Sequence, residues 1–370
     1  ASLGTIFTVP VCNCTNEEVR DWIADHALKV AVARVDGALP YDQFSYDGGT
    51  VIVLGSEAEG VSSAWHREAD QGVYLPMAGA ADSLNISATA AVMAEACIYA
   101  GTHYIDITGE IEVFEQLKTL DERALKAKVT LLPGAGFDVV ASDCLAAHLH
   151  SELPEATQLQ LGFCGEGGTS PGTLKTMIEM LGKGGRVRRG GKIVKVPAGY
   201  RQKGIVFSDG RRRHCMTIPW GDISAAYRST AIPNIRVYTA VPLLSAIAIR
   251  FLSPLLILLR VPLLKNWLKR VVGTRVSGPN AQQRAEGCMR LWGEVRDAEG
   301  ESRVAWLDVP EGYQFTVMSC LRVVNRVLQG DVQPGFQTPS GAFGAEFVSS
   351  LPGCQFTDAE SSEAVSVGQS

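Results

Sequence analysis

Three loops rich in glycine and polar residues each follow an apolar segment in the first 85 residues. They read LGSEAEG (54–60), LPMAG (75–79) and ADSLN (81–85), and the last one leads into a helical pattern. Glycine lets the backbone approach a ligand, and the free N–H groups at a helix start favour carboxylate or phosphate. Such loops are also typical of ordinary turns. They therefore mark a candidate ligand site without identifying the ligand.

A second set of polar residues and glycines occurs in YIDITGE (104–110) and PGAGFD (133–138). Asp106 and Glu110 are two carboxylates near the end of an apolar strand pattern. They either position a substrate or cap and pair within the fold, because paired carboxylates also occur in structural networks. PGAGFD has the spacing G-x-G-x-x-V, which a tight turn between a strand and a helix also explains. Both interpretations stay open for both loops.

Alternating strand and helix patterns position the first set of loops. Strands are expected at 5–11, 30–35, 48–55 and 72–79, and helices at 15–28 and 82–96. Thr15 and Glu18 form a capping-box pattern at the start of the first helix. Strands that alternate with helices predict a parallel sheet with ligand loops at the carboxyl ends of the strands.

The remaining chain predicts a second α/β arrangement. Parallel strands are expected at 102–108 and 129–134 on either side of a helix at 112–128, and Ser142 is the expected N-cap of the next helix. Strand patterns at 158–165, 192–200, 204–210, 235–241 and 291–309 are separated by turn signals such as Asp209-Gly210. This spacing predicts an open mixed or antiparallel sheet.

Residues 1–96 resemble the carboxyl half of the SpoU family of RNA ribose 2′-O-methyltransferases. ASLGTIFTVPV, VIVLGSEAEGVSSAWHREAD, VYLPMAG and DSLNISATAAVMAEA carry the resemblance, in the family's order and spacing. It implies a parallel α/β fold with a trefoil knot, one of the rare exceptions to the rule against knots. It also implies a homodimer, an RNA substrate and S-adenosylmethionine as the cofactor.

The resemblance to SpoU enzymes also implies roles for individual residues. The backbone of Leu75 and Met77 would hold the adenine, and Asn85 would lie nearest the reacting centre. The implied cofactor-binding set is Leu54, Gly55, Glu57, Gly60, Leu75, Met77, Gly79, Ser83, Leu84 and Asn85, with Gly55 and Glu57 beside the ribose and the methionine end. The family's first motif, an asparagine and an arginine upstream, has no counterpart here. We therefore expect a cofactor cradle without methyl transfer unless upstream sequence is restored.

Residues 97–370 resemble the saccharopine-dehydrogenase-like reductases, including the trans-acting enoyl reductases. The resemblance rests on EACIYAGTHYIDITGE, LLPGAGFDVVASDC, TIPWGDISAAYRSTAIPN, RLWGEV, VPEGYQF and GDVQPGFQTPSGAFG. It implies the last elements of a Rossmann-like domain (97–152), a substrate and dimerisation domain (153–335) and a carboxyl segment with a flexible tail (336–370). Gly134, Gly136, Phe137 and Asp138 would lie beside the nicotinamide and the substrate.

That this second part binds NAD(P) is implied only by the resemblance to the reductases. The family binds NAD(P) through a G-x-G-x-x-G turn after its first strand, and no such turn precedes residue 97. Both resemblances end within AVMAEACIYAG (91–101), inside one helical pattern. We favour a recombined or misassembled reading frame, with an evolved fusion as the alternative. The functional alternatives are a methyl-donor site, an NAD(P)-dependent oxidoreductase, and a hybrid without catalysis.

Composition narrows the functional classes further. The 370 residues carry a formal net charge of −5, so no global basic field indicates nucleic acid. The basic segments 182–195 and 211–213 are interpreted as a solvated rim, with RNA contact as the alternative. The nine cysteines show no metal-ligand spacing, so no metal is expected, and their lack of a disulfide pattern predicts a reducing, cytoplasmic location.

An apolar stretch at 237–271 raises the question of a membrane. Arg250 and Arg260 divide it into runs shorter than the ~20 residues that cross a bilayer, and prolines 242, 254 and 262 interrupt it further. We favour a buried helix with snorkelling arginines. The alternative is a segment that lies on a membrane surface with Lys265, Lys269 and Arg270 at the headgroups.

Overall fold

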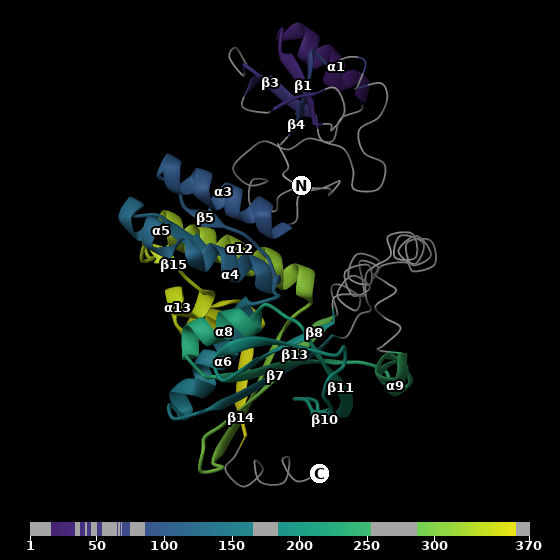
Figure 1. Cartoon of the computed structure of the whole chain (residues 1–370), viewed down its shortest axis with the longest axis vertical. Helices are drawn as coiled ribbons and strands as arrows, with labels where there is room; N and C mark the ends of the chain where they lie inside the picture. Colours follow the sequence, from purple (N-terminus) through teal and green to yellow (C-terminus); the bar gives the residue numbers. More distant parts are fainter. Residues whose placement is uncertain are drawn as a thin grey trace. The chain divides into compact units, whose positions relative to one another are not determined.

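The computed structural model describes residues 16–33, 38–40, 43–45, 50–53, 65, 67, 69–74, 86–165, 184–252 and 287–359. The chain divides into two compact units, residues 1–85 and 86–370 (Figure 1). Each unit has sheets and a hydrophobic core of its own.

The first unit contains a parallel sheet, as the alternating pattern predicts. Helix α1 (Asn16–Asp25) precedes β1 (Lys29–Ala33), β2 (Leu39–Pro40), β3 (Thr50–Val53) and β4 (Gln71–Tyr74). The strand order is β2-β4-β1-β3, and every pairing is parallel. Ile23, Val30, Val32 and Trp65 are buried together, so α1 packs on the sheet through its apolar face. The strand expected at 5–11 and the capping residue Thr15 lie outside the described residues. The knot stays a prediction.

The second unit begins with helix α3 (Ile86–Ala100), which is followed by β5 (Tyr104–Ile105), α4 (Ile111–Thr119), α5 (Asp121–Ala127), β6 (Thr130–Leu132) and α6 (Val140–Glu152). Strands β5 and β6 are parallel, as predicted. The third strand of this small sheet, β15 (Gly335–Phe336), pairs with β6 from far along the chain. Ala90 and Ala94 of α3 are buried in one core with Val113 and Leu117 of α4. Helix α3 therefore packs within the second unit.

Two predictions about these helices are wrong in detail. The single helix expected at 112–128 is interrupted at Leu120, which ends α4 and precedes α5. The Thr119 hydroxyl donates to the carbonyl of Gln116 at 2.7 Å, and Asp121 restarts the helix with an acidic first turn, which the helix dipole favours. Ser142 is not an N-cap, because α6 begins at Val140.

A large mixed sheet forms the rest of the second unit. Its strands are β7 (Gln158–Gly165), β8 (Gly185–Arg189), β9 (Lys192–Val196), β10 (Gln202–Val206), β11 (Arg212–Ile218), β12 (Asn234–Ala240), β13 (Cys288–Arg296), β14 (Ser302–Pro310) and β16 (Gln355–Asp358). The main order is β10-β11-β12-β7-β13-β14-β16, with β8 beside β12 and β9 beside β8. The pairing of β12 with β7 is parallel, and the other pairings are antiparallel.

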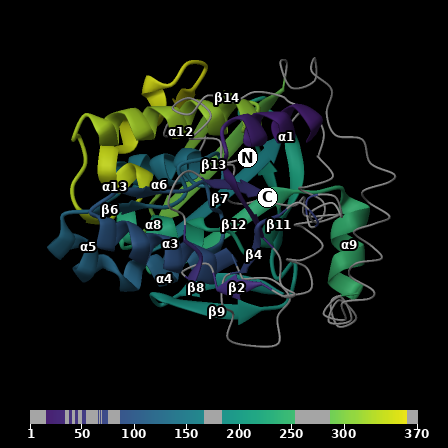
Figure 2. The ribbon, with the colours of Figure 1, turned by 90° about the horizontal axis from the view of Figure 1, so that it is seen from above.

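Helices cover one face of this sheet. The main core joins the inward side chains of β7, β13 and β14 to α6, to α8 (Asp222–Thr230), to α12 (Gly312–Leu328) and to the 3₁₀ helix η4 (Ala345–Ser350), which follows α13 (Pro339–Phe343) (Figure 2). Gly293 of β13 lies so close to Leu149 of α6 that any Cβ would overlap it. Glycine at this position lets the helix approach the sheet closely.

The opposite face of the large sheet is rolled into a concave surface. Trp306 Nε1 of β14 donates to the carbonyl of Val206 of β10 at 2.9 Å, although these strands are not neighbours in the sheet order. Ser208 and Asp308 form a second link of 2.6 Å. Trp292 and Ile205 fill the space between and are almost completely buried. The sheet predicted as open is therefore curved, with a second core inside the curve.

Two surface predictions are partly wrong. Arg188, in the basic segment expected to form a solvated rim, is buried: its guanidinium donates to the carbonyls of Ile223 and Gly191 and pairs with Glu115. Helix α9 (Leu243–Leu252), expected to be buried, leaves Leu243 and Ile247 exposed. No helix in the described part of the chain is long and apolar enough to cross a membrane.

Candidate functional site

All ten residues expected to bind S-adenosylmethionine lie outside the described residues. The strands that lead to two of their loops are described: β3 ends at Val53, just before Leu54, and β4 ends at Tyr74, just before Leu75. Both strands are parallel to β1, so their carboxyl ends lie at the same edge of the sheet. This is the edge where parallel α/β sheets bind ligands.

The structure brings all six expected residues of the second loop set together, at the carboxyl ends of β5 and β6. Asp106 holds the two loops to each other. Its Oδ1 accepts from the backbone N–H of Thr108 at 2.8 Å and of Gly134 at 3.0 Å, and its Oδ2 accepts from the Tyr104 hydroxyl at 2.7 Å. Burial raises the pKa of Asp106, and these three hydrogen bonds oppose the shift. Of the two interpretations of Asp106, capping and pairing fits these contacts.

Different neighbours require glycine at the two glycine positions of the loop after β6. Gly134 has φ +77°, and a Cβ there would come within 2.8 Å of the Phe114 ring. At Gly136 a Cβ would come within 3.0 Å of the Thr316 methyl group on α12. Helix α12 also binds the loop directly, because Phe137 N–H donates to Thr316 Oγ1 at 3.0 Å and Ser319 Oγ donates to the Ala135 carbonyl at 2.8 Å. The loop is thus fixed from both sides.

Phe137 is part of an aromatic cluster. Its ring makes edge-to-face contacts with Phe163 at 6.2 Å and with Phe315 at 6.1 Å between ring centroids. Trp220 lies against Phe163 with a centroid distance of 5.3 Å, and its indole N–H donates to the backbone carbonyl of Asp138 at 2.8 Å. Phe137, Phe163 and Trp220 are each partly exposed. The cluster therefore offers apolar ring surface next to the Asp138 backbone.

Asp138 is the acidic group of this loop. Burial, and to a lesser extent the nearby Glu110, raise its pKa from 3.8 to about 6. Its carboxyl group also lies against the β5–α4 turn, where a Cβ on Gly109 would come within 2.9 Å of Asp138 Oδ2. A carboxyl group with this pKa gains and loses a proton near neutral pH, which suits a general acid or base. Glu110, the second residue of the carboxylate pair, precedes α4 without a side-chain capping bond.

Two fully buried carboxyl groups lie behind this loop. Asp222, at the start of α8, accepts from the Ser142 hydroxyl at 2.5 Å through Oδ1, while its Oδ2 has no hydrogen-bond partner among the described residues. Burial raises the pKa of Asp222 well above its usual value, and Asp143 and Asp138 raise it further. Asp143 accepts from Ser229 at 2.6 Å and from the Ser340 N–H at 2.8 Å. Burial therefore favours the neutral form of the Asp222 carboxyl group.

Sequence patterns did not indicate Trp220, Thr316 or Asp222. Trp220 and Asp222 stand within TIPWGD, so the motif was recognised but not the residues that contact the loop. Thr316 contacts Phe137 across 179 positions of sequence on an amphipathic helix. Nothing in the local pattern of that helix marks the threonine.

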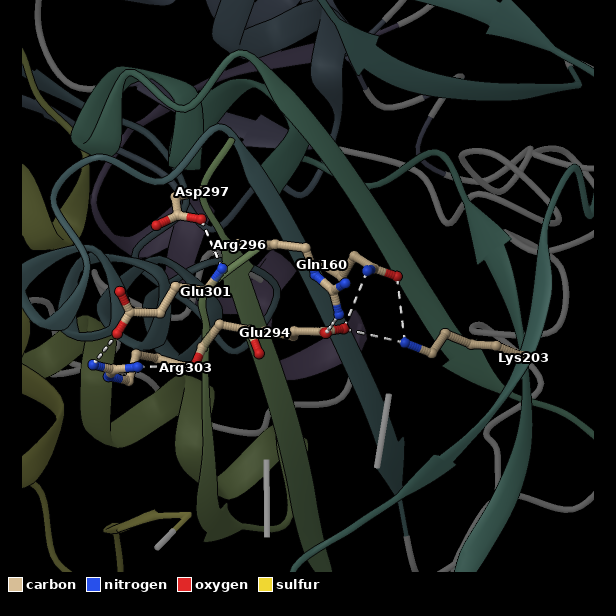
Figure 3. Close-up of polar contacts among 8 residues, drawn as sticks. Gln160, Lys203, Glu294, Arg296, Asp297, Glu301 and Arg303 are labelled. Carbon is tan, nitrogen blue, oxygen red and sulfur yellow. Dashed lines mark hydrogen bonds and ion pairs between the residues drawn. The ribbon is translucent and has the colours of Figure 1, made fainter. Parts of the chain in front are cut away.

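A charged network on the concave face of the large sheet is a second place where polar groups gather (Figure 3). The buried Glu294 accepts from Gln160 at 3.1 Å and Arg296 at 2.9 Å, and it pairs with Lys203 at 3.3 Å. Lys203 also lies over the Trp292 ring, 4.4 Å from its centroid. Each charged group of the network has a partner. Since its members come from different strands, the network links β7, β10 and β13. Across the described ranges, no group of three His, Cys, Asp or Glu residues could hold a metal ion.

The amino-terminal part of the chain is similar to known proteins. Residues 1–95 match the SpoU rRNA Methylase family. This SpoU segment is 36% identical over 94 residues to an uncharacterized tRNA/rRNA methyltransferase of Mycobacterium avium, and the match covers 25% of this chain and 30% of that protein. It is 33% identical over 93 residues to the 23S rRNA (adenosine(1067)-2′-O)-methyltransferase of Streptomyces laurentii, with 25% and 34% covered. The chain spans about a third of the length of these curated relatives.

Solved structures resemble different parts of the chain. The SpoU methyltransferase AviRb of Streptomyces viridochromogenes, in complex with AdoMet, is 31% identical over 22% of this chain and 33% of its own, with a TM-score of 0.21. The saccharopine dehydrogenase (L-Glu forming) of Saccharomyces cerevisiae is 10% identical over 90% of this chain and 100% of its own, with a TM-score of 0.47. The SpoU segment ends at residue 95, inside α3, although α3 packs within the second unit.

Proposed function

We propose that residues 1–95 form the S-adenosylmethionine-binding part of an RNA ribose 2′-O-methyltransferase. The family match over these residues carries the proposal. The parallel strands β3 and β4 support it, because both lead from one edge of the sheet into the loops of the resemblance. A knotted fold, a homodimer and an RNA substrate belong to the same proposal.

The roles of the loop residues follow from the family. The backbone of Leu75 and Met77 would hold the adenine, Gly55 and Glu57 would lie beside the ribose and the methionine end, and Asn85 would lie nearest the transferred methyl group. An amide side chain there donates and accepts hydrogen bonds, so it can orient a ribose hydroxyl or the cofactor.

Calorimetric titration of the full chain with S-adenosylmethionine and S-adenosylhomocysteine tests the proposal. We expect binding of both, with the affinity lowered about tenfold by Asn85→Ala, the loss of one to two net hydrogen bonds. Asn325→Ala, at an exposed position of α12, is the matched control and should leave the affinity unchanged. If the unaltered chain binds neither molecule, the proposal fails.

We infer a second function for the second unit, the nicotinamide and substrate end of an NAD(P)-dependent oxidoreductase. Its support is the assembly of Phe137 and Asp138 at the carboxyl ends of β5 and β6, beside the partly exposed rings of Phe163 and Trp220. An aromatic surface suits a flat nicotinamide ring. The carboxyl groups of Asp138 and Glu110 make the same place unsuitable for the anionic pyrophosphate, which must be held elsewhere.

Titration with NADPH, followed by nicotinamide fluorescence, tests the second function. We expect the fluorescence to change on binding and the change to be smaller in Phe137→Leu. Phe356→Leu, which alters a ring stacked on His148 at β16, is the matched control. A chain that leaves NADPH fluorescence unaltered contradicts this function and leaves the methyl-donor proposal standing.

We further propose that parts of two enzymes meet inside α3, by recombination or misassembly of the reading frame. The end of the SpoU match at residue 95, within a helix that continues to Ala100, supports this. Sequencing single molecules of the source DNA across codons 80–110 tests it. A clean product that recurs in independent samples would favour an evolved fusion instead.

A further inference from the structure

The charged network on the concave face of the large sheet has a buried centre and an accessible outside. Figure 3 shows the side chains of Gln160, Lys203 and Arg296 converging on the carboxylate of Glu294 from different strands. The Glu294 side chain is only 7% exposed, whereas those of Lys203 and Arg296 are 32% and 40% exposed. The carboxylate thus holds two cations in place, and both cations stay accessible to solvent.

Arg236 of β12 belongs to the same face. It is the register partner of Gln160 on β7, and Gln160 is in turn the partner of Glu294 on β13. Side chains directly opposite each other on neighbouring strands share a face of the sheet. Burial raises the pKa of Tyr238, and the nearby Arg236 and Arg201 oppose this shift, while Glu294 adds to it. All three charged groups therefore lie near the Tyr238 hydroxyl.

Arg201 reaches this face from the start of β10. Its N–H donates to Thr217 Oγ1 at 3.1 Å, and the Thr217 N–H donates to its carbonyl at 2.9 Å, which continues the antiparallel ladder of β10 and β11 by one residue. Arg201 and Lys203 are two residues apart, so they share a face. Arg201 is exposed. A cationic cluster thus forms on the concave face, and its members are Arg201, Lys203, Arg236 and Arg296.

Positive charge exceeds negative charge in the cationic cluster. Glu294 pairs with Lys203 and Arg296, and in the part of the chain that the structure describes no salt bridge joins Arg201 or Arg236 to a carboxylate. The acidic residues of the β13–β14 turn are engaged locally: Asp297 accepts from the Glu301 N–H at 2.8 Å, and Glu301 pairs with Arg303 at 2.7 Å. A concave surface lined by one sign of charge concentrates ions of the opposite sign.

The cationic cluster is separate from the loop after β6. Gln160 and Phe163 are three residues apart on β7, so they point to opposite faces of the sheet. Phe163 packs against Phe137 and Trp220 on the face that the helices cover. A ligand of the cationic cluster would therefore not be the substrate or nicotinamide of that loop.

We propose that the cationic cluster binds the phosphate group of a small molecule, either inorganic phosphate or a phosphate monoester. The guanidinium forks of Arg236 and Arg296 suit the paired oxygens of a phosphate, and Lys203 adds a point charge. A phosphate dianion matches the excess of positive charge better than a carboxylate does. Trp292 and Tyr238 are almost completely buried, so the site offers charge rather than apolar surface. This favours a small and strongly polar ligand.

The shape of the surface favours one phosphate over a nucleic-acid backbone. An RNA strand is held by cations that follow successive phosphates along an extended path. Here the cations come from β10, β12 and β13 and surround one buried carboxylate inside the curve of the sheet. The arrangement therefore converges on a point.

Calorimetric titration of the full chain with sodium phosphate, at constant ionic strength, tests the proposal. We expect saturable binding with a Kd of about 1 mM or tighter, weaker binding as sodium chloride is added, and little binding of acetate. Arg236→Gln should lower the phosphate affinity about tenfold, the loss of one charge-assisted contact. Arg236→Lys, which keeps the charge but not the fork, should lose less. Arg201→Gln should lower the affinity about threefold, because this exposed group is screened by solvent.

Arg303→Gln is the matched control, because Arg303 lies on β14 at the edge of the same view and is 44% exposed (Figure 3). It should leave the phosphate affinity unchanged. Circular dichroism checks that the variants fold, and the exposed Arg201 provides a test that does not disturb buried contacts. Absence of saturable phosphate binding overturns the proposal, as does an equal loss in Arg303→Gln. A chain that binds a short RNA through Arg236 but takes up no phosphate would assign the surface to nucleic acid and also overturn it.

Discussion

The carboxyl group of Asp138 should make the second unit less stable as the pH rises through the weakly acidic range. Its pKa is raised from 3.8 to about 6, first by burial and then by Glu110, because the folded protein disfavours the ionised form. Below the lower value the group is neutral whether the chain is folded or unfolded. Above the higher value it is ionised in both states, and only the folded state is penalised. Stability contributed at low pH is therefore lost between these two values.

The size of the effect follows from the interval between the two pKa values. At 1.36 kcal/mol for each pH unit, the interval from 3.8 to about 6 corresponds to about 3 kcal/mol as an upper bound. Asp138→Asn keeps the shape of the side chain and removes the charge. It also keeps the hydrogen bond from Trp220, which goes to the backbone carbonyl. The variant should be up to about 3 kcal/mol more stable than the unaltered chain near neutral pH and about equal to it near pH 4.

Urea unfolding at several pH values between about pH 4 and pH 8, followed by tryptophan fluorescence, measures this difference. Glu110→Gln should give a smaller gain in the same direction, because Glu110 is the lesser cause of the shift. Glu122→Gln, an exposed position of α5, is the matched control and should give no gain. A variant Asp138→Asn that is destabilised at neutral pH, or stabilised equally at every pH, would refute the reasoning.

Two further predictions concern the loop and the carboxyl groups behind it. Gly134→Ala should lower the free energy of unfolding, measured in urea, by about 2–4 kcal/mol, because φ is +77° and the Cβ would meet an aromatic ring. Gly210→Ala is the control. It has φ +72° in open space, and should lower the free energy of unfolding by only about 1 kcal/mol. Equal losses would contradict the steric argument. Ser142→Ala should lower the free energy of unfolding by about 1–3 kcal/mol, since both oxygens of the buried Asp222 would then lack a hydrogen-bond partner among the described residues. A smaller decrease would show that another group replaces the serine hydroxyl.

Local patterns predicted much of the fold correctly. The apolar alternation at 158–165 became β7, and Asp209-Gly210 forms the turn between the antiparallel strands β10 and β11. The parallel pairing of β1, β3 and β4 also follows the predicted alternation of strands and helices. In each case the pattern that predicts the element lies within a few residues of it, or in the order of strands and helices along the chain.

Contacts distant in the sequence were beyond this kind of prediction. Ser142 looked like an N-cap, but Asp222, 80 positions away, takes its hydroxyl. The sequence predicted a mixed or antiparallel sheet but not which strands are parallel: β12 pairs in parallel with β7, and four other strands lie between them in the chain. The Thr316 and Trp220 contacts to the β6 loop likewise depend on helix packing and strand order. The glycines of that loop were predictable, but the groups that surround them were not.

The position of α3 decides where the two units can be separated for biochemical study. Ala90 and Ala94 lie in the core against Val113 and Leu117, and Glu95 pairs with Arg123 of α5 at 2.7 Å. A cut after residue 95, where the family match ends, would strip this helix from α4 and leave the apolar side of α4 in water. Expression of the second unit alone should therefore start no later than Ile86. A piece that starts at residue 96 would be expected to aggregate for reasons unrelated to its catalytic capacity.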